Sequence, residues 1–214
     1  MELRLDDMEI RIMGSLIEKE LSTPDYYPLS LNALTNACNQ KSNRDPVVAY
    51  GEADVEATLE RMIEKQAVWK SNVGRVTKYE ERFTHSRSLV PRESAVLCVL
   101  FLRGPQTQGE IRSRTTRLFE FEDLAQVQEA LDNLAEWGMV RRLPRMPGHK
   151  ESRYIHLLAG EVEDAQIPAT PETEPVVPAI DPSRIETIEQ ALAGLRDEVD
   201  ALKAEFAELK KQFE

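Results

Sequence analysis

Apolar side chains recur at helical spacing in two segments of the chain, and the two segments align with each other at an offset of 72 residues. Residues 55–70 and residues 127–142 each have the pattern of an amphipathic helix that runs directly into a short strand. Gly138 is typical of the position just after a helix, because glycine adopts a left-handed backbone easily. Lys65-Gln66 gives a weaker stop at the matching place. The pattern predicts an internal repeat.

Two further helices are predicted ahead of each of these segments. In the first copy, the apolar spacing predicts a helix over about residues 6–21, and Ser30 is a suitable cap for a second helix. In the second copy, Pro91 opens a helix, since proline is favoured in the first helical turn. Thr107 then begins another helix, and Glu110 completes the spacing of a capping box.

Each copy also ends in a candidate β-hairpin. In the first copy, residues 67–71 and 75–84 flank the turn sequence Asn72-Val73-Gly74. In the second copy, residues 139–143 and 154–158 flank a loop that contains proline and glycine. The order helix, helix, helix, strand, wing, strand is that of a winged helix-turn-helix domain, and a generic α+β repeat is the alternative.

We therefore expect a mainly α fold with small β-hairpins (α+β), made of two tandem winged helix-turn-helix domains plus a C-terminal coiled-coil helix. The first domain would span residues 1–88 and the second residues 89–159. Residues 160–182 contain six acidic residues, five prolines and no basic residue. Such a segment cannot bury enough apolar surface to fold, so we expect a stiff acidic linker. Residues 183–214 would form the coiled coil.

The apolar residues of this last segment alternate at spacings of three and four. That is the 3.5-residue period of a coiled-coil seam. Leucine at one seam position and β-branched residues at the other favour two strands, and Glu198 opposite Lys203 favours a parallel pair. We expect a homodimer; the alternatives are a helix that folds back on its own domains and a helix that pairs with another protein. The expected dimerisation residues are Ile185, Ile188, Leu192, Leu195, Val199, Leu202, Phe206 and Leu209.

Two sequence runs in the first copy are distinctive. They are IEKELSTPDYYPL at residues 17–29 and NACNQKSNRDPV at residues 36–47. With the tandem layout, they resemble the YceH-like family of uncharacterised bacterial proteins. The resemblance covers about residues 5–158 and leaves the predicted coiled coil outside it. It implies two winged-helix domains in tandem and no established activity.

The formal net charge of −11 does not exclude nucleic acid as a partner, because over half of the acidic excess falls in the linker. The third helix of each predicted domain argues against the usual mode of DNA binding, in which this helix enters the major groove. The first of these helices begins with acids at residues 51–56, and the second follows acids at residues 119–123. Acidic groups there would repel phosphate at the end that leads into the groove.

Basic side chains concentrate elsewhere, in the second predicted wing (residues 141–153) and in the loop at residues 39–46. The candidate contacts to nucleic acid or another anion are Lys41, Asn43, Arg44, Arg141, Arg142, Arg145, His149, Lys150 and Arg153. The second helix of the second copy adds Arg112, Arg114 and Arg117. Such groups set affinity for phosphate without reading sequence. The alternatives are a solvated hairpin with Arg/Glu pairs and a loop whose polar groups bond their own backbone.

The leading hypothesis is a non-enzymatic regulatory or adaptor protein that binds DNA through its basic wings. The alternative is a protein-interaction module that never touches nucleic acid, and a third class is a small-molecule sensor that uses the loop at Lys41–Arg44. We expect no enzyme, cofactor or metal: the three histidines lack a catalytic partner in sequence, and no Cys/His cluster has ligand spacing. Cys38 and Cys98 fit buried, reduced thiols. With no apolar signal region and no run of about 18 apolar residues, we expect a cytoplasmic protein without a membrane partner.

Overall fold

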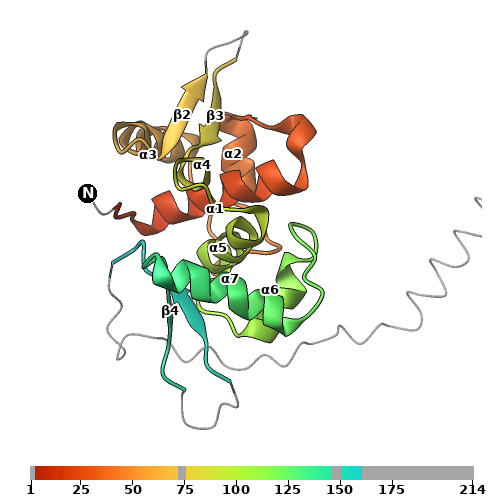
Figure 1. The fold of residues 1–214 in the computed structure, drawn as a ribbon. Helices are drawn as coiled ribbons and strands as arrows, with labels where there is room; N and C mark the ends of the chain where they lie inside the picture. Colours follow the sequence, from red (N-terminus) through yellow and green to blue (C-terminus); the bar gives the residue numbers. More distant parts are fainter. Residues whose placement is uncertain (1–2, 72–75, 146–150, 161–214) are drawn as a thin grey trace, which may run out of the picture. The chain divides into compact units, whose positions relative to one another are not determined.

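The computed structural model describes residues 3–71, 76–145 and 151–160 (Figure 1). Within them, the chain has a mixed α+β fold with seven α-helices and two small antiparallel sheets. The first part comprises α1 (Asp7–Ser22), a 3-10 helix η1 (Pro24–Tyr26), β1 (Leu29–Ser30), α2 (Leu31–Cys38), α3 (Glu52–Glu64), β2 (Val68–Ser71), β3 (Lys78–Glu81) and α4 (Phe83–Ser86). The second part comprises α5 (Pro91–Arg103), α6 (Gln108–Thr115), α7 (Leu124–Glu136), β4 (Val140–Arg142) and β5 (Tyr154–His156). The predicted linker and coiled coil lie outside the described residues.

The helices begin where the sequence predicts, because their first turns are capped by neighbouring side chains. Ser30 Oγ accepts a hydrogen bond from the backbone N–H of Ala33 at 3.3 Å. Thr107 and Glu110 form the reciprocal capping box of α6, with backbone-to-side-chain bonds of 3.2 and 2.8 Å. Pro91 is the first residue of α5. Each cap satisfies a backbone N–H that has no partner inside its helix.

The internal repeat is present in the structure. Helices α3 and α7 each contain 13 residues, and their bounds are offset by 72 residues at both ends. The second residue after each helix has a left-handed backbone, with a φ of 57° at Gln66 and 69° at Gly138. The β1–β3 pair Leu29↔Tyr79 has a counterpart in the isolated bridge Gln106↔Tyr154. The repeat therefore extends beyond the aligned helix and strand.

The predicted strand over residues 75–84 is wrong at its end, because β3 stops at Glu81 and the chain enters the short helix α4. The buried Glu81 carboxylate accepts both the backbone N–H of Thr84, at 2.9 Å, and the Thr84 hydroxyl. These bonds fix a helical turn directly after the strand. The hairpin partner β2 and the second hairpin, β4 with β5, fall within the predicted ranges.

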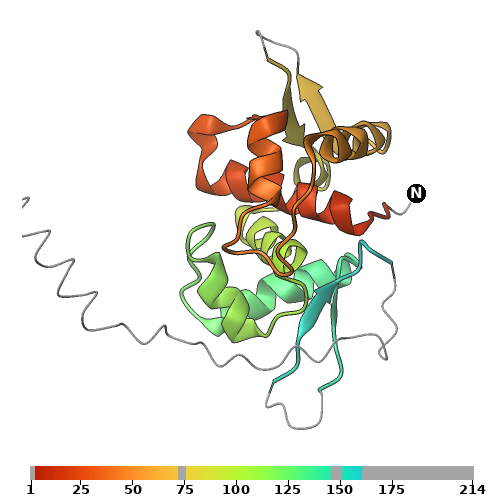
Figure 2. The same cartoon turned by 180° about the vertical axis from the view of Figure 1, so that it is seen from behind.

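The two repeats share one hydrophobic core, centred on α1 and α5 (Figure 1 and Figure 2). Almost every residue in the middle of these two helices is buried, which is typical of helices covered on all sides.

Gly14 allows α1 and α5 to approach each other closely, since a Cβ added there would lie 2.9 Å from Leu102 Cδ2. The Cys98 thiol donates to the Gly14 carbonyl at 3.4 Å, and both cysteines are free and buried, as predicted. None of the described helices combines the length and the apolar character that crossing a bilayer requires.

Candidate functional site

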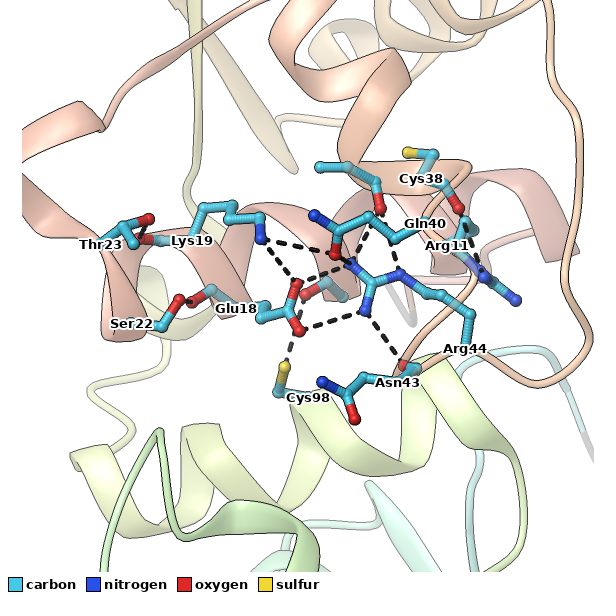
Figure 3. A network of polar contacts seen from close by, with 12 residues as sticks. Arg11, Glu18, Lys19, Ser22, Thr23, Cys38, Gln40, Asn43, Arg44 and Cys98 are labelled. Atoms are coloured by element: carbon cyan, nitrogen blue, oxygen red, sulfur yellow. Dashed lines mark hydrogen bonds and ion pairs between the residues drawn. The ribbon is translucent and has the colours of Figure 1, made fainter. Parts of the chain in front are cut away.

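The loop between α2 and α3 is anchored to α1 by Arg44, whose side chain is buried (Figure 3). Its guanidinium nitrogens donate to both carboxylate oxygens of Glu18, at 3.1 and 2.6 Å. Arg44 also donates to the Ala37 carbonyl, at the end of α2, and to Gln40 Oε1. The anion that Arg44 binds in this structure is therefore the chain's own Glu18. Such a bidentate pair holds the loop in one position.

The environment of this pair stabilises the ionised form of Glu18. Burial alone would raise the pKa of Glu18, but the hydrogen-bonded Arg44 guanidinium outweighs it, and the pKa of this carboxyl lies below its ordinary value. On the outer side of the same loop, Lys41 and Asn43 are exposed. Asn43 Oδ1 accepts a hydrogen bond from Arg103 Nη2 at 2.7 Å, so the loop also contacts the C-terminal end of α5. The loop thus connects the two repeats.

A groove of about 1160 Å³ lies beside this loop, between α1, the end of α5 and α6. The described residues that line it include five basic ones: Lys19, Lys41, Arg103, Arg114 and Arg117. Sequence reasoning singled out Lys41, Arg114 and Arg117, but it missed the contribution of Lys19 and Arg103. Both missed residues occur in the last turn of a helix, where a basic side chain is ordinarily explained by the helix dipole. Only the packing of α1 against α5 brings them to one place.

The segment predicted as the second wing, which includes the β4–β5 hairpin, presents two of its predicted contacts to solvent. Arg142 and Arg145 are exposed and line a polar hollow of about 360 Å³ with Gln108 of α6 and Gln128 of α7. Arg153 is instead held inside, where it donates to Glu110 Oε2 at 3.1 Å and to a backbone carbonyl. Arg141 is half-buried, and His149 and Lys150 lie outside the described residues.

The third helix of each repeat exposes acidic side chains. On α3 the exposed acids are Glu52, Asp54, Glu56, Glu60 and Glu64. On α7 they are Glu129, Asp132 and Glu136. Lys70 pairs with Glu60 at 2.7 Å, and Arg92 pairs with Glu129 at 2.8 Å. Most of these carboxylates form no ion pair with another described residue. A phosphate backbone placed against α3 would meet net repulsion.

One group of potential metal ligands occurs among the described residues, and it was not foreseen because one member, Glu20, is distant in sequence from the other two. Glu20, Glu81 and His85 have ligand atoms within 4.8 Å of one another. His85 Nε2 lies 2.8 Å from Glu20 Oε1, and this hydrogen bond raises the pKa of His85. Burial raises the pKa of Glu81, whose two oxygens accept the bonds from Thr84 described above. The geometry favours an ion pair next to a structural carboxyl.

Comparison with known proteins identifies the family. Residues 5–149 match the model of a protein family of unknown function, DUF480. A UPF0502 protein of Solibacter usitatus is 49% identical over 215 residues, which are 100% of this chain and 97% of that protein. A UPF0502 protein of Geotalea uraniireducens is 49% identical over 219 residues and covers both chains fully. One of Vibrio parahaemolyticus is 46% identical over 220 residues, 98% of this chain and 99% of that protein.

The first two of these relatives align over the whole chain, so the segment after residue 160 has a counterpart in them. The sequence resemblance had left this segment outside its range. The family model and the identities agree with the YceH-like resemblance. The chain belongs to the DUF480 (UPF0502) family of uncharacterised bacterial proteins.

Proposed function

We propose that this chain is a cytoplasmic, non-enzymatic regulatory or adaptor protein with two tandem winged-helix domains, and that its second wing binds DNA. The order of elements supports the domain assignment. In the first repeat, α1, β1, α2 and α3 precede the β2–β3 hairpin. In the second, α5, α6 and α7 precede the β4–β5 hairpin, and the bridge at Gln106 takes the place of β1.

The observation that carries the DNA-binding proposal is the hollow beside the second wing. Arg142 and Arg145 place two positive charges at its rim, and its walls include Gln108 and Gln128 rather than the acids found elsewhere on α7. Of the described residues that line it, one is acidic, Glu151. Arginine forms bidentate bonds with phosphate, and glutamine can bond phosphate or a base edge. Such a surface supports moderate affinity that depends on salt.

Dimerisation through the C-terminal heptads would strengthen this weak contact. The seam between Ile185 and Leu209 supports a parallel pair of chains, and each chain would then present one second wing. When one wing is bound, the other has a raised effective concentration near the same duplex. Sedimentation of the full chain tests this part. A 24.4 kDa species alone at micromolar concentration would remove it.

The DNA proposal is tested by fluorescence anisotropy with a random-sequence duplex at low and at moderate salt. We expect binding that weakens as salt rises, and a loss of at least tenfold in affinity for the Arg142→Ala/Arg145→Ala variant. The matched control is Arg4→Ala/Arg92→Ala, which removes the same charge from other surfaces of the molecule. Absence of binding at low salt, or an equal loss in both variants, contradicts the proposal.

A protein partner is the second candidate, and the exposed acidic side of α3 favours it. Next to α3, Trp69 of β2 is 52% exposed, and the Arg82 guanidinium lies 5.1 Å from its ring centroid. Exposed tryptophan and arginine are enriched in protein interfaces. Glu56→Lys/Glu60→Lys would abolish capture of a basic protein partner through this surface, whereas the same variant would leave the DNA affinity of the second wing unreduced.

A further inference from the structure

The groove between the two repeats combines a large volume with an unusual density of positive charge. Lys19 comes from α1 and Lys41 from the loop between α2 and α3, whereas Arg103, Arg114 and Arg117 come from α5, α6 and the turn after α6. Among the described residues that line it, Glu18 is the one acid, and it pairs with Arg44 at 2.6 Å and with Lys19 at 3.4 Å. A chain with a formal charge of −11 therefore has a local surface with a clear positive excess.

Much of this positive charge is not used by the protein itself. Within the described part of the chain, neither Lys41 nor Arg117 has a hydrogen bond or an ion pair. Arg103 donates to the neutral amide of Asn43, and Arg114 pairs with Glu110 at 3.3 Å. Burial lowers the pKa of Arg103, and repulsion from the nearby Arg114 guanidinium lowers it further. A bound anion would relieve this repulsion.

The other lining residues narrow the chemistry of the ligand. Hydroxyl and amide groups of Ser42, Asn43, Ser113 and Thr116 add neutral hydrogen-bonding groups at the rim, and Leu102 gives part of the floor an apolar surface. No aromatic side chain is found among the described residues that line the groove, and these residues therefore offer no stacking platform of the kind with which proteins bind single-stranded nucleic acid. The volume is that of a site for a small molecule rather than a metal ion.

We infer that this groove binds a small molecule that carries a chain of phosphate groups, such as a nucleoside triphosphate or an inorganic polyphosphate. The phosphates lie between the basic residues of the two repeats, and the rest of the molecule lies over the apolar floor. Because the cations come from both repeats, the bound ligand connects α1 and the loop between α2 and α3 to α6. The site is separate from the second wing, so this inference does not depend on DNA binding.

The probes are sodium tripolyphosphate and ATP, each compared with sodium sulfate at equal ionic strength, in thermal unfolding and titration calorimetry of the full chain. Because a ligand that binds only the folded state stabilises it, we expect either phosphate probe to raise the unfolding temperature by several degrees where sulfate does not. Stabilisation by tripolyphosphate equal to that by ATP would indicate that the phosphate chain is sufficient for binding. Greater stabilisation by ATP would indicate that the apolar floor also contributes to binding. No stabilisation beyond that of sulfate by either probe, at millimolar concentration, overturns the inference.

Two variants locate the effect. Lys41→Ala/Arg117→Ala removes two exposed cations without intramolecular partners in the described structure, so folding is retained and the dissociation constant of the phosphate probe rises at least tenfold. Arg142→Ala/Arg145→Ala removes the same charge at the second wing and leaves that constant unchanged. An equal loss in both variants would indicate nonspecific attraction and overturn the inference. The inference is also overturned if the Lys41→Ala/Arg117→Ala variant loses duplex binding while neither phosphate probe binds the unmodified chain. The groove would then be a surface for nucleic acid.

Discussion

Arg44 is a loop residue whose side chain is held in the interior of the protein by an ion pair with one acid, Glu18. It is 5% exposed, and its partner Glu18 lies on the central helix α1. A buried ion pair adds little stability over an apolar pair, but removal of one partner leaves the other charged and without compensation. The pair therefore fixes the position of the loop, and its contribution to stability is measured by substituting one of the two residues.

We expect Arg44→Ala to lower the free energy of unfolding by roughly 3–5 kcal/mol, since the buried Glu18 carboxylate would lose its bidentate partner and keep only the weaker ion pair with Lys19, at 3.4 Å. Urea denaturation measures this loss. Lys41→Ala, in the same loop but exposed, should change stability by no more than about 0.5 kcal/mol. The double variant Arg44→Met/Glu18→Leu should be more stable than Arg44→Ala. If Arg44→Ala has the stability of the unmodified protein, the structural role given to the pair is wrong.

His156 makes a separate prediction about pH. It is 8% exposed, its ring contacts Phe101 at a centroid distance of 5.0 Å, and burial lowers its pKa to about 4. The unfolded chain binds a proton near pH 6.5, so it takes up more protons than the folded chain between pH 6.5 and about 4. The stability from neutral His156 is complete above pH 6.5 and decreases by roughly 3 kcal/mol as pH falls through this window.

Carboxylates also titrate near the lower end of this window, so the measurement is a difference between two proteins. Unfolding free energies of the unmodified chain and of His156→Leu, which keeps an apolar contact with Phe101, are compared from pH 4 to pH 7. We expect the slope with pH to be smaller in the variant. Parallel curves would show that His156 does not contribute.

At the scale of elements, the end of the third helix of each repeat requires a left-handed residue. The second repeat has Gly138 there, whereas the first has Gln66, a residue with a side chain that disfavours this backbone. A Cβ added at Gly138 would meet no atom within 4 Å, so any effect of a substitution there comes from the backbone alone. The two positions thus differ in local strain and not in packing.

We expect Gly138→Ala to destabilise the chain by about 1 kcal/mol, and Gln66→Gly to cause no loss or a gain of up to about 1 kcal/mol. The matched control is Gly109→Ala inside α6, where φ is not left-handed and the nearest atom, Thr107 Oγ1, is 4.0 Å from the new Cβ. Helix propensity predicts that this control stabilises by up to about 1 kcal/mol. Thermal unfolding of the three variants gives the order of their stabilities. A loss of stability in Gln66→Gly would contradict the explanation by backbone strain.

Elements set by neighbouring residues could be predicted from the sequence. The caps at Ser30 and Thr107 act over three residues, and the helix-to-strand pattern was visible twice. The turn into α4 could not be predicted, because Tyr27, from far along the chain, accepts a hydrogen bond from the Glu81 backbone at 2.6 Å and helps to end β3. The groove could not be predicted either, since Lys19 and Arg103 come together only when two distant helices pack.

At the scale of the whole molecule, the shared core makes the two repeats depend on each other. Helices α1 and α5 are each buried by the other repeat, and the Leu5 N–H donates to the Leu158 carbonyl at 2.8 Å, which joins the ends of the described unit. A repeat separated from its neighbour would expose an apolar helix face to water, which is strongly unfavourable. Each repeat should therefore be unstable without the other, and the two should unfold together.

The two tryptophans of the chain allow this cooperativity to be measured, because Trp69 belongs to the first repeat and Trp137 to the second. Both are about half exposed, so Trp69→Phe and Trp137→Phe leave the core intact and give proteins that report on one repeat each. We expect the two fluorescence transitions in urea to coincide, as two-state unfolding requires.

Gly14→Ala, which places a Cβ 2.9 Å from Leu102, should shift both transitions to lower urea concentration by the same amount, for a loss in the free energy of unfolding of roughly 1–3 kcal/mol. Gly109→Ala serves as the control at an uncrowded glycine. Separate transitions, or a shift confined to the Trp69 reporter, would mean that the α1–α5 contact does not couple the repeats, and a ligand in the groove between them would then have no shared core through which to act.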